Sequence, residues 1–207
     1  MSALPVDGRA ARWVGHREQR RAEIVDAAIS VIEREGPGAT VEQIGAALGV
    51  TRQVVYRQFT DRADLDHAIA ETAATRLVDD LLPHLDLSGD IAGSVRVALL
   101  AYVDYVEAHL PLYRFVRAHD NELETPDSSV RRVKATVVSR VADIARDHLL
   151  ASGLAPAVNA DAFATGLVGM ADAVVNRWLD APGETTRDEV VDTLVLMITG
   201  VIAGVTS

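Results

Sequence analysis

The sequence predicts an all-α protein, with a three-helix helix-turn-helix head at its N-terminal end, a larger helical body and about nine helices in all. Apolar residues recur at helical spacing along the whole chain, and no segment shows the sustained alternation of β-branched and aromatic residues that a strand needs. Glycine and proline separate the apolar stretches, as they do between helices. We expect a flexible basic arm (1–16), a helix-turn-helix domain (17–62) and a larger helical domain (63–207).

The head is predicted from three consecutive helical patterns. A wide apolar stripe marks the first helix, which Gly36-Pro37-Gly38 ends. Thr40 and Gln43 have the spacing of a capping box, which begins a short second helix that Gly49 ends. Thr51 is expected to cap the third helix. The first and third predicted helices span 17–35 and 52–59.

The body is predicted as a further series of helices, separated mainly by proline, glycine and polar residues. The polar segment 120–128 is expected to be a loop. The predicted body helices are 61–82, a helix from 88 or 90 to 109, a helix beginning near Pro111, 130–152, 160–179 and 187–205.

Composition excludes several classes of protein. With no cysteine in the chain, a disulfide framework, a thiolate metal site and a cysteine nucleophile are impossible. The arginine-rich segment 1–21 lacks the apolar stretch of a signal peptide. The uncharged run 193–207 is shorter than the roughly 20 residues that span a bilayer. We therefore expect a cytoplasmic protein with a buried C-terminal helix.

The net charge of −10 is unevenly distributed. Residues 1–60 hold eight arginines and seven acidic residues, so they carry +1, and the other 147 residues carry −11. Because phosphate binding depends on local basic groups, the acidic body does not exclude a nucleic-acid partner for the head.

The predicted third helix presents two different faces. Val55 and Phe59 point toward the core, whereas Gln53 and Arg57 point the opposite way. The outward face has side chains that suit the major groove: arginine for guanine or phosphate, glutamine for adenine and Val54 for a thymine methyl group. The segment therefore predicts binding to double-stranded DNA.

Further contacts are expected around this face. Tyr56 suits a phosphate contact, although packing is its alternative role. Thr40 lies at a helix N-terminus that can hold a phosphate oxygen, and Arg62 adds a basic contact. Arg9 and Arg12 belong either to an arm that enters the minor groove or to a disordered tail. The candidate DNA-binding residues are Arg9, Arg12, Thr40, Thr51, Arg52, Gln53, Val54, Tyr56, Arg57 and Arg62.

From Ile24 to about Ile69 the sequence resembles the N-terminal DNA-binding region of TetR-family regulators. The residues that match the pattern of that family are Thr40, Ile44, Gly49, Val50, Thr51, Tyr56 and Phe59. Three departures are mild: Gly45 replaces the usual alanine and Thr51 the usual serine, and either Arg62 or a neighbouring residue takes the role of the lysine that is common at the start of the fourth helix.

The resemblance implies a homodimer, held together by the last two helices of each subunit as a four-helix interface. The predicted last helix is apolar nearly all round, so something must cover more than one of its sides. A central helix in a monomer is the alternative. A two-fold dimer would match a palindromic operator, with its recognition helices about 34 Å apart or at a multiple of the helical repeat.

The resemblance also implies a small-molecule pocket in the body, and hence a repressor that an unknown, mostly apolar effector releases by shifting a population of conformations. Ordinary core packing is the alternative role for each lining residue. The candidate ligand-binding residues are Tyr102, Val106, His109, Phe163, Leu167, Met170 and Asn176.

Two other classes of function are alternatives to a regulator. A helical metal-dependent enzyme would use groups such as His109, His119 and Glu122, yet they have no established ligand spacing and no catalytic motif accompanies them. A protein-interaction adaptor would leave the arginine-rich third helix unexplained. We therefore expect no catalytic residue, metal or cofactor, and no membrane partner.

Overall fold

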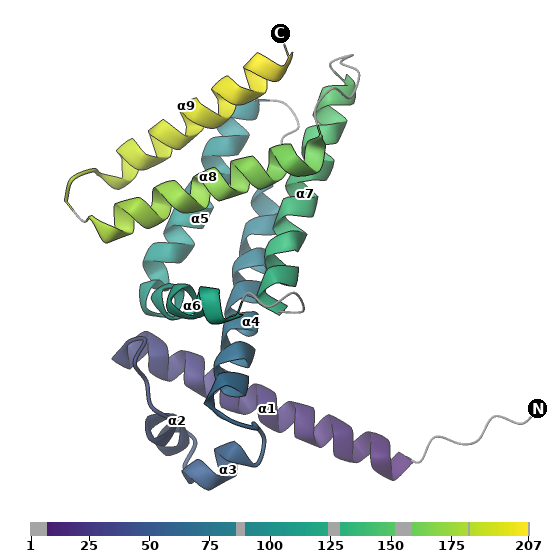
Figure 1. Ribbon diagram of the computed structural model, residues 1–207, viewed down its shortest axis with the longest axis vertical. Helices are drawn as coiled ribbons and strands as arrows, with labels where there is room; N and C mark the ends of the chain where they lie inside the picture. Colours follow the sequence, from purple (N-terminus) through teal and green to yellow (C-terminus); the bar gives the residue numbers. More distant parts are fainter. Residues whose placement is uncertain (1–7, 86–89, 124–128, 152–158, 182, 207) are drawn as a thin grey trace, which may run out of the picture. The chain divides into compact units, whose positions relative to one another are not determined.

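The computed structural model describes residues 8–85, 90–123, 129–151, 159–181 and 183–206, and within them every regular element is helical (Figure 1). The all-α prediction is therefore confirmed. The elements are α1 (Gly8–Glu35), α2 (Val41–Ala47), α3 (Arg52–Tyr56), α4 (Arg62–Leu81), the 3-10 helix η1 (Leu82–His84), α5 (Ile91–Ala108), α6 (Leu110–Leu123), α7 (Ser129–Ala151), α8 (Ala160–Asp180) and α9 (Arg187–Thr206).

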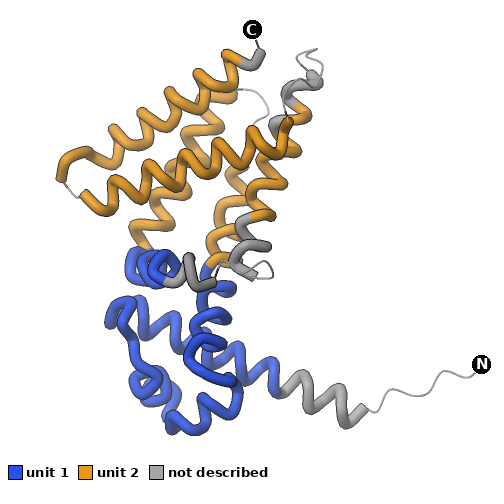
Figure 2. The backbone as a smooth tube through the Cα atoms, in the orientation of Figure 1, with its two compact units in different colours: residues 1–73, 109–125 blue, residues 74–108, 126–207 orange. Residues whose placement is uncertain are grey.

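The chain divides into two compact units (Figure 2). Unit 1 comprises residues 1–73 and 109–125, and unit 2 comprises residues 74–108 and 126–207. Helix α4 contributes its N-terminal part to unit 1 and its C-terminal part to unit 2. The functional boundary predicted after residue 62 stays a prediction.

Unit 1 is built around the apolar stripe of α1. The stripe predicted on this helix is buried, and it forms one cluster with residues of α2, α3, α4 and α6. Val55 and Phe59, on either side of the end of α3, are almost fully inaccessible to solvent within this cluster. Because α3 has only five residues, its helical conformation depends on this packing rather than on its own hydrogen bonds.

The turn between α2 and α3 follows the predicted chemistry. Thr40 and Gln43 form a reciprocal capping box at the start of α2. Gly49 has φ +66°, a left-handed conformation that glycine adopts without a steric penalty. A Cβ atom on Gly45 would lie 2.7 Å from the carbonyl oxygen of Val50, so the alanine that is usual here would require the turn to shift.

A second set of contacts holds the turn after α3 and the start of α4 against α1. The guanidinium of Arg21 lies 4.1 Å from the centroid of the Phe59 ring, and its Nη2 donates to Oδ1 of Asp64 over 2.9 Å. Arg21 also donates to the carbonyl oxygen of Gln58. Asp64 accepts a further hydrogen bond from the backbone N–H of Thr60 at 2.8 Å. We call Arg21, Phe59 and Asp64 the Arg21 clamp.

Unit 2 contains the remaining helices. Helix α7 packs along α8, and α9 packs against both α5 and α8. Buried Val95, Leu99 and Val106 recur at helical spacing on α5, and α9 buries a stripe that includes Val191 and Leu194. No helix in the described part of the chain combines the length and the apolar character needed to cross a membrane.

Three boundaries differ from the predicted ones by more than two or three residues or move a residue out of its predicted helix. Helix α1 begins at Gly8, inside the predicted flexible arm, since the alanines and arginines of this segment favour helix. Helix α3 ends at Tyr56 rather than Phe59, and a turn carries Phe59 into the core. Helix α6 continues to Leu123, into the predicted loop, because polar residues without glycine or proline do not end a helix.

The Arg21 clamp gives a testable pH dependence. The hydrogen bond from Arg21 lowers the pKa of Asp64 in the native state; burial opposes it by a smaller amount, and the hydrogen bond from the Thr60 backbone N–H lowers the pKa further. Asp64→Asn should therefore lower the free energy of unfolding by about 1 kcal/mol near neutral pH, a modest value because the side chain is partly exposed. This stabilisation is present above the ordinary aspartate pKa of about 4 and is lost as the pH falls through the lower native pKa.

Urea unfolding of both proteins at a series of pH values measures this difference. Asp147→Asn is the control, because Asp147 is exposed on α7. A difference between wild type and Asp64→Asn that stayed constant down to about pH 2.5 would contradict the assignment.

Candidate nucleic-acid interface

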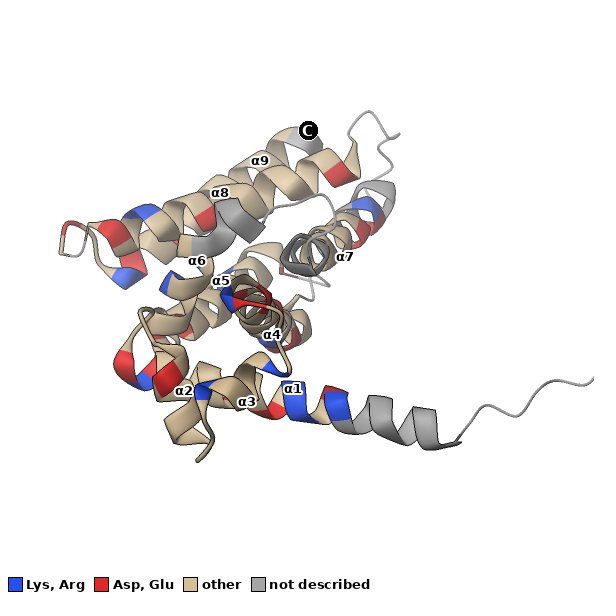
Figure 3. Cartoon of the chain, turned by 60° about the horizontal axis from the view of Figure 1, so that its bottom comes forward, with Lys and Arg blue, Asp and Glu red and all other residues tan. Residues whose placement is uncertain are grey.

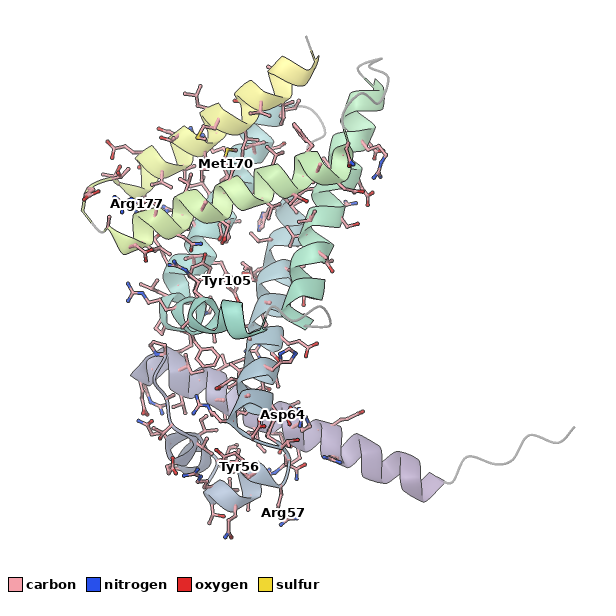
Figure 4. The ribbon with its side chains drawn as sticks, viewed as in Figure 1. Tyr56, Arg57, Asp64, Tyr105, Met170 and Arg177 are labelled. Carbon is pink, nitrogen blue, oxygen red and sulfur yellow. The ribbon has the colours of Figure 1, made fainter. Side chains whose placement is uncertain are left out.

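The outer face of α3 combines cationic, amide and aromatic groups. Arg52, Gln53 and Arg57 are exposed, and Tyr56 is partly buried. Together these four side chains line a shallow depression with a volume of about 450 Å³. Figure 4 shows Tyr56 and Arg57 at the C-terminal end of α3 in unit 1. The predicted separation of an inward and an outward face on this helix therefore agrees with the structure.

Arg52 has two neighbours on this face. Its Nη1 donates to Oε1 of Glu42 on α2 over 2.7 Å, and its guanidinium lies 5.2 Å from the centroid of the Tyr56 ring. The Tyr56 ring also packs against the core cluster of unit 1. Both roles considered for Tyr56 are thus compatible, since a ring can pack on one side and leave its polar end near the surface.

The two threonines differ in their local hydrogen bonds. Thr40 is exposed, and its hydroxyl accepts from the backbone N–H of Gln43 over 3.3 Å, as predicted for a cap. Thr51 occupies the N-cap position of α3, but its side chain makes no capping hydrogen bond, so the predicted cap is wrong in this respect. Its hydroxyl is exposed beside the outer face. Val54 is partly buried next to it.

Arg62 is engaged inside unit 1. Its Nε donates to the carboxylate of Asp66 over 2.8 Å, and its Nη1 donates to the carbonyl oxygen of Ala39 over 3.0 Å. Asp66 is the buried charged residue among the described side chains. Because Ala39 precedes the N-cap Thr40, this arginine joins the start of α4 to the start of α2. Arg62 therefore helps to position α2 and α4 at the candidate interface through its contacts within unit 1.

Figure 3 shows basic residues on the part of α1 that lies beside α3. Arg17 is exposed and Arg20 partly so, and Arg20 pairs with Glu23 at 2.7 Å. Arg9 and Arg12 lie on the helical backbone of α1, but their side chains are outside the described residues. Their contact with DNA stays a prediction.

Sequence reasoning missed Glu42 and the Arg21 clamp. Glu42 lies ten residues before its partner Arg52, and Arg21 lies 43 residues before Asp64. Neither spacing is a local helical one. The sequence signal was indirect: residues 1–60 hold nearly equal numbers of arginines and acidic residues, so ion pairs between them could be expected.

The candidate ligand-binding residues fall into both units. Tyr102 on α5 donates from its hydroxyl to Oδ1 of Asp172 on α8 over 3.1 Å. His109 belongs to unit 1, where its Nδ1 lies 2.7 Å from Oε1 of Glu33. The structure therefore does not group His109 with the others. The remaining candidates lie in unit 2, Val106 buried and the rest partly buried: Val106, Phe163, Leu167, Met170 and Asn176.

Among the described residues, no three histidine, aspartate or glutamate side chains gather in a way that could hold a metal ion. The acidic and histidine groups of unit 1 are instead engaged with partners such as Arg21, Arg62 and Glu33. What the outer face of α3 can do is donate hydrogen bonds and positive charge to an extended acidic partner.

Three comparisons identify the kind of protein to which this geometry belongs. Residues 24–69 match the model of the bacterial regulatory proteins of the tetR family. An uncharacterized HTH-type transcriptional regulator of Mycobacterium tuberculosis is 28% identical over 203 residues, which are 98% of this chain and 85% of that protein. The match therefore extends through both compact units.

Solved structures share the fold at lower identity. A tetR-family transcriptional regulator from Streptomyces coelicolor has a TM-score of 0.70 and 19% identity, and the match covers 91% of this chain and 82% of that one. The TetR-like regulator LfrR from Mycobacterium smegmatis, solved in complex with proflavine, has a TM-score of 0.57 and 22% identity, with coverages of 86% and 94%.

The residues that match the family model include α2, α3 and the outer face of α3. Members of this family are transcriptional regulators rather than enzymes. The enzyme alternative is thereby set aside. Residues 24–69 are a DNA-binding region of the tetR family of bacterial regulatory proteins, and the chain that contains them is a DNA-binding regulator of transcription.

Proposed function

We propose that this regulator binds a palindromic operator as a homodimer, represses transcription there and is released by a small, mostly apolar ligand. The observation that carries the proposal is the outer face of α3, where Arg52, Gln53 and Arg57 are exposed above a buried Val55. In this proposal residues 17–62 bind DNA in the cytoplasm, and residues 63–207 dimerise and bind the ligand.

The proposed contacts follow from side-chain chemistry. Arg57 suits a guanine edge or a phosphate, Gln53 an adenine edge, and Val54 a thymine methyl group. Thr40 and Thr51 would hold phosphates through their hydroxyls and the neighbouring backbone N–H groups. Arg9 and Arg12 would reach the adjacent minor groove from the start of α1.

The proposed dimer interface is formed by α8 and α9. Apolar side chains on α9 remain exposed although the helix already packs against α5 and α8: Leu196 is 74% exposed, and Val201 is 44% exposed. Gly200 and Gly204 lie on the same helix, with open space where a Cβ would stand. A partner helix can approach closely over small residues and cover the exposed apolar ones, which favours association through this face.

The proposed ligand site lies in unit 2 near the Tyr102–Asp172 hydrogen bond. This polar pair joins α5 to α8, and the buried Val106 lies one helical turn beyond Tyr102 on α5. A few orienting polar groups in an apolar surround are typical of ligand sites. LfrR, which shares the fold, was solved with proflavine. That ligand makes aromatic and other lipophilic compounds the first candidates for this chain.

Release of DNA requires that the ligand favour one of two conformations. Helix α4 is continuous through Ala73, where unit 1 gives way to unit 2, and its first turn holds the start of α2 through Arg62 and Ala39. A ligand that changes the preferred position of α4 would thereby change the spacing of the two recognition helices in a dimer.

Arg57→Ala should weaken binding to the operator about tenfold, because a groove contact from an exposed arginine is lost. The operator is first selected by the wild-type protein from a randomised pool of duplexes, and affinity is then measured by fluorescence anisotropy. Arg140→Ala is the control, since Arg140 is exposed on α7 and its loss changes the net charge equally. Equal affinity of the Arg57→Ala variant and the control would contradict the role of α3.

Leu196→Glu should convert the dimer to a monomer and abolish cooperative binding to a two-half-site operator, since it places a charge in an apolar interface. Sedimentation velocity measures the mass, and the same duplex measures binding. Val97→Glu is the control, because Val97 is 51% exposed but lies on α5, outside the proposed interface. The interface would be wrong if Leu196→Glu stayed dimeric, or if Val97→Glu alone became monomeric.

Proflavine and a panel of lipophilic compounds should include at least one that lowers operator affinity of the wild-type dimer. Met170→Trp should reduce this effect about tenfold, because it places a larger ring at a candidate ligand-binding position of α8, whereas Ser139→Trp, at an exposed position of α7, should not. Anisotropy with increasing compound measures both variants. A dimer that kept its affinity with every compound and metabolite tested would contradict ligand-induced release.

A further inference from the structure

The ion pair between Glu42 and Arg52 joins the two helices of the helix-turn-helix at the edge of the outer face of α3. Glu42 lies in the first turn of α2, and Arg52 is the first residue of α3. Their atoms Oε1 and Nη1 are 2.7 Å apart, while each side chain is about 60% exposed. An acidic residue on a surface that must meet phosphates repels them, so its presence there needs a specific reason.

Two neighbours constrain the Arg52 guanidinium. The Glu42 carboxylate accepts from one of its amino groups, and the Tyr56 ring lies 5.2 Å away. An arginine with one edge held in this way still has N–H groups on its other edge, and a guanine edge requires two parallel N–H donors in a defined plane. A freely rotating arginine pays conformational entropy to reach that geometry.

Charge gives a second consequence. The paired carboxylate offsets the positive charge of Arg52, which weakens its attraction to phosphates of any sequence. The pKa of Glu42 is lowered by a hydrogen bond to its own backbone N–H and then by the hydrogen bond from Arg52, so the carboxylate is ionised at neutral pH. The pair is therefore neutral when DNA approaches.

We propose that Glu42 is a specificity-determining positioning residue, which holds Arg52 for a base edge and prevents it from serving as a general phosphate contact. Glu42 itself need not touch DNA, because it acts through Arg52. This inference rests on the proposed function of α3 in operator recognition. It adds that the discrimination between operator and other DNA depends on an acidic residue of α2.

Glu42→Gln tests the inference, because it removes the charge and keeps the shape of an exposed side chain. The full-length protein is titrated against the duplex that the wild type selects and against a scrambled duplex of equal length, at several salt concentrations. The ratio of the two affinities should fall about tenfold. Binding to the scrambled duplex should strengthen, with a salt dependence steeper by about one counterion, as Arg52 becomes free to contact phosphate.

Arg52→Ala provides the coupling test. In the Arg52→Ala background, Glu42→Gln should no longer lower the affinity ratio, because the residue through which Glu42 acts is absent. Glu184→Gln is the matched control, since Glu184 is also an exposed glutamate near an arginine, 3.6 Å from Arg177 in unit 2. It should leave the affinity ratio and the salt dependence unchanged. Thermal unfolding of each variant checks that the folded state is retained.

Three results would overturn the inference while the wild type still discriminates its operator. The affinity ratio of Glu42→Gln could be unchanged. Both duplexes could bind more tightly by the same factor, which would make Glu42 a general repulsive charge. The ratio could fall equally with and without Arg52. A wild-type protein without preference for any selected duplex would instead overturn the proposed function and this inference together.

Discussion

The burial of Val55 and Phe59 in the core cluster of unit 1 is the interaction on which the candidate DNA-binding surface depends. Helix α3 is too short to be stable by itself, and its residues become helical because two apolar side chains enter a core that α1, α4 and α6 already form. The Arg21 guanidinium lies over the Phe59 ring and donates to Asp64, so a charged contact also fixes the turn that follows α3. Once the inner face is held, the outer face has a fixed direction.

Electrostatics around α3 are local rather than global. The chain carries a net charge of −10, yet the outer face of α3 presents Arg52 and Arg57. Several arginines of unit 1 are occupied by acidic partners, including Arg21, Arg52 and Arg62. The acidic partners reduce the attraction of these arginines to phosphate, and the ion pairs fix the positions of the helices and guanidinium groups. Such an arrangement favours discrimination between DNA sequences over tight binding to all of them.

In unit 2 the main feature is an apolar side of α9 that the neighbouring helices leave exposed. Helix α9 is apolar on more sides than α5 and α8 cover, and Leu196 remains largely exposed. Gly200 and Gly204 are also exposed on α9, with open space where a Cβ atom would stand. Association with a second copy would bury that apolar area and, through two-fold symmetry, would present two recognition helices to a palindrome. Dimerisation and operator recognition would then depend on one another.

The sequence by itself determined the helical class, most helix positions, the capping box at Thr40 and the inward direction of Val55 and Phe59. These features follow from periodicity and turn chemistry, which act over a few residues. Helix ends were less predictable: α1 begins earlier and α6 ends later than expected, because no glycine or proline fixes these boundaries.

Only the tertiary structure decided which distant residues meet. Glu42 pairs with Arg52 across the turn, and Arg21 with Asp64 across the unit. His109 continues the spacing of Tyr102 and Val106 in the sequence, but α5 ends at Ala108. His109 belongs to unit 1, and it contacts Glu33 of the same unit. Periodicity assigns a residue to a face of its own helix; the partner of that face depends on how helices pack, and no local pattern encodes that packing.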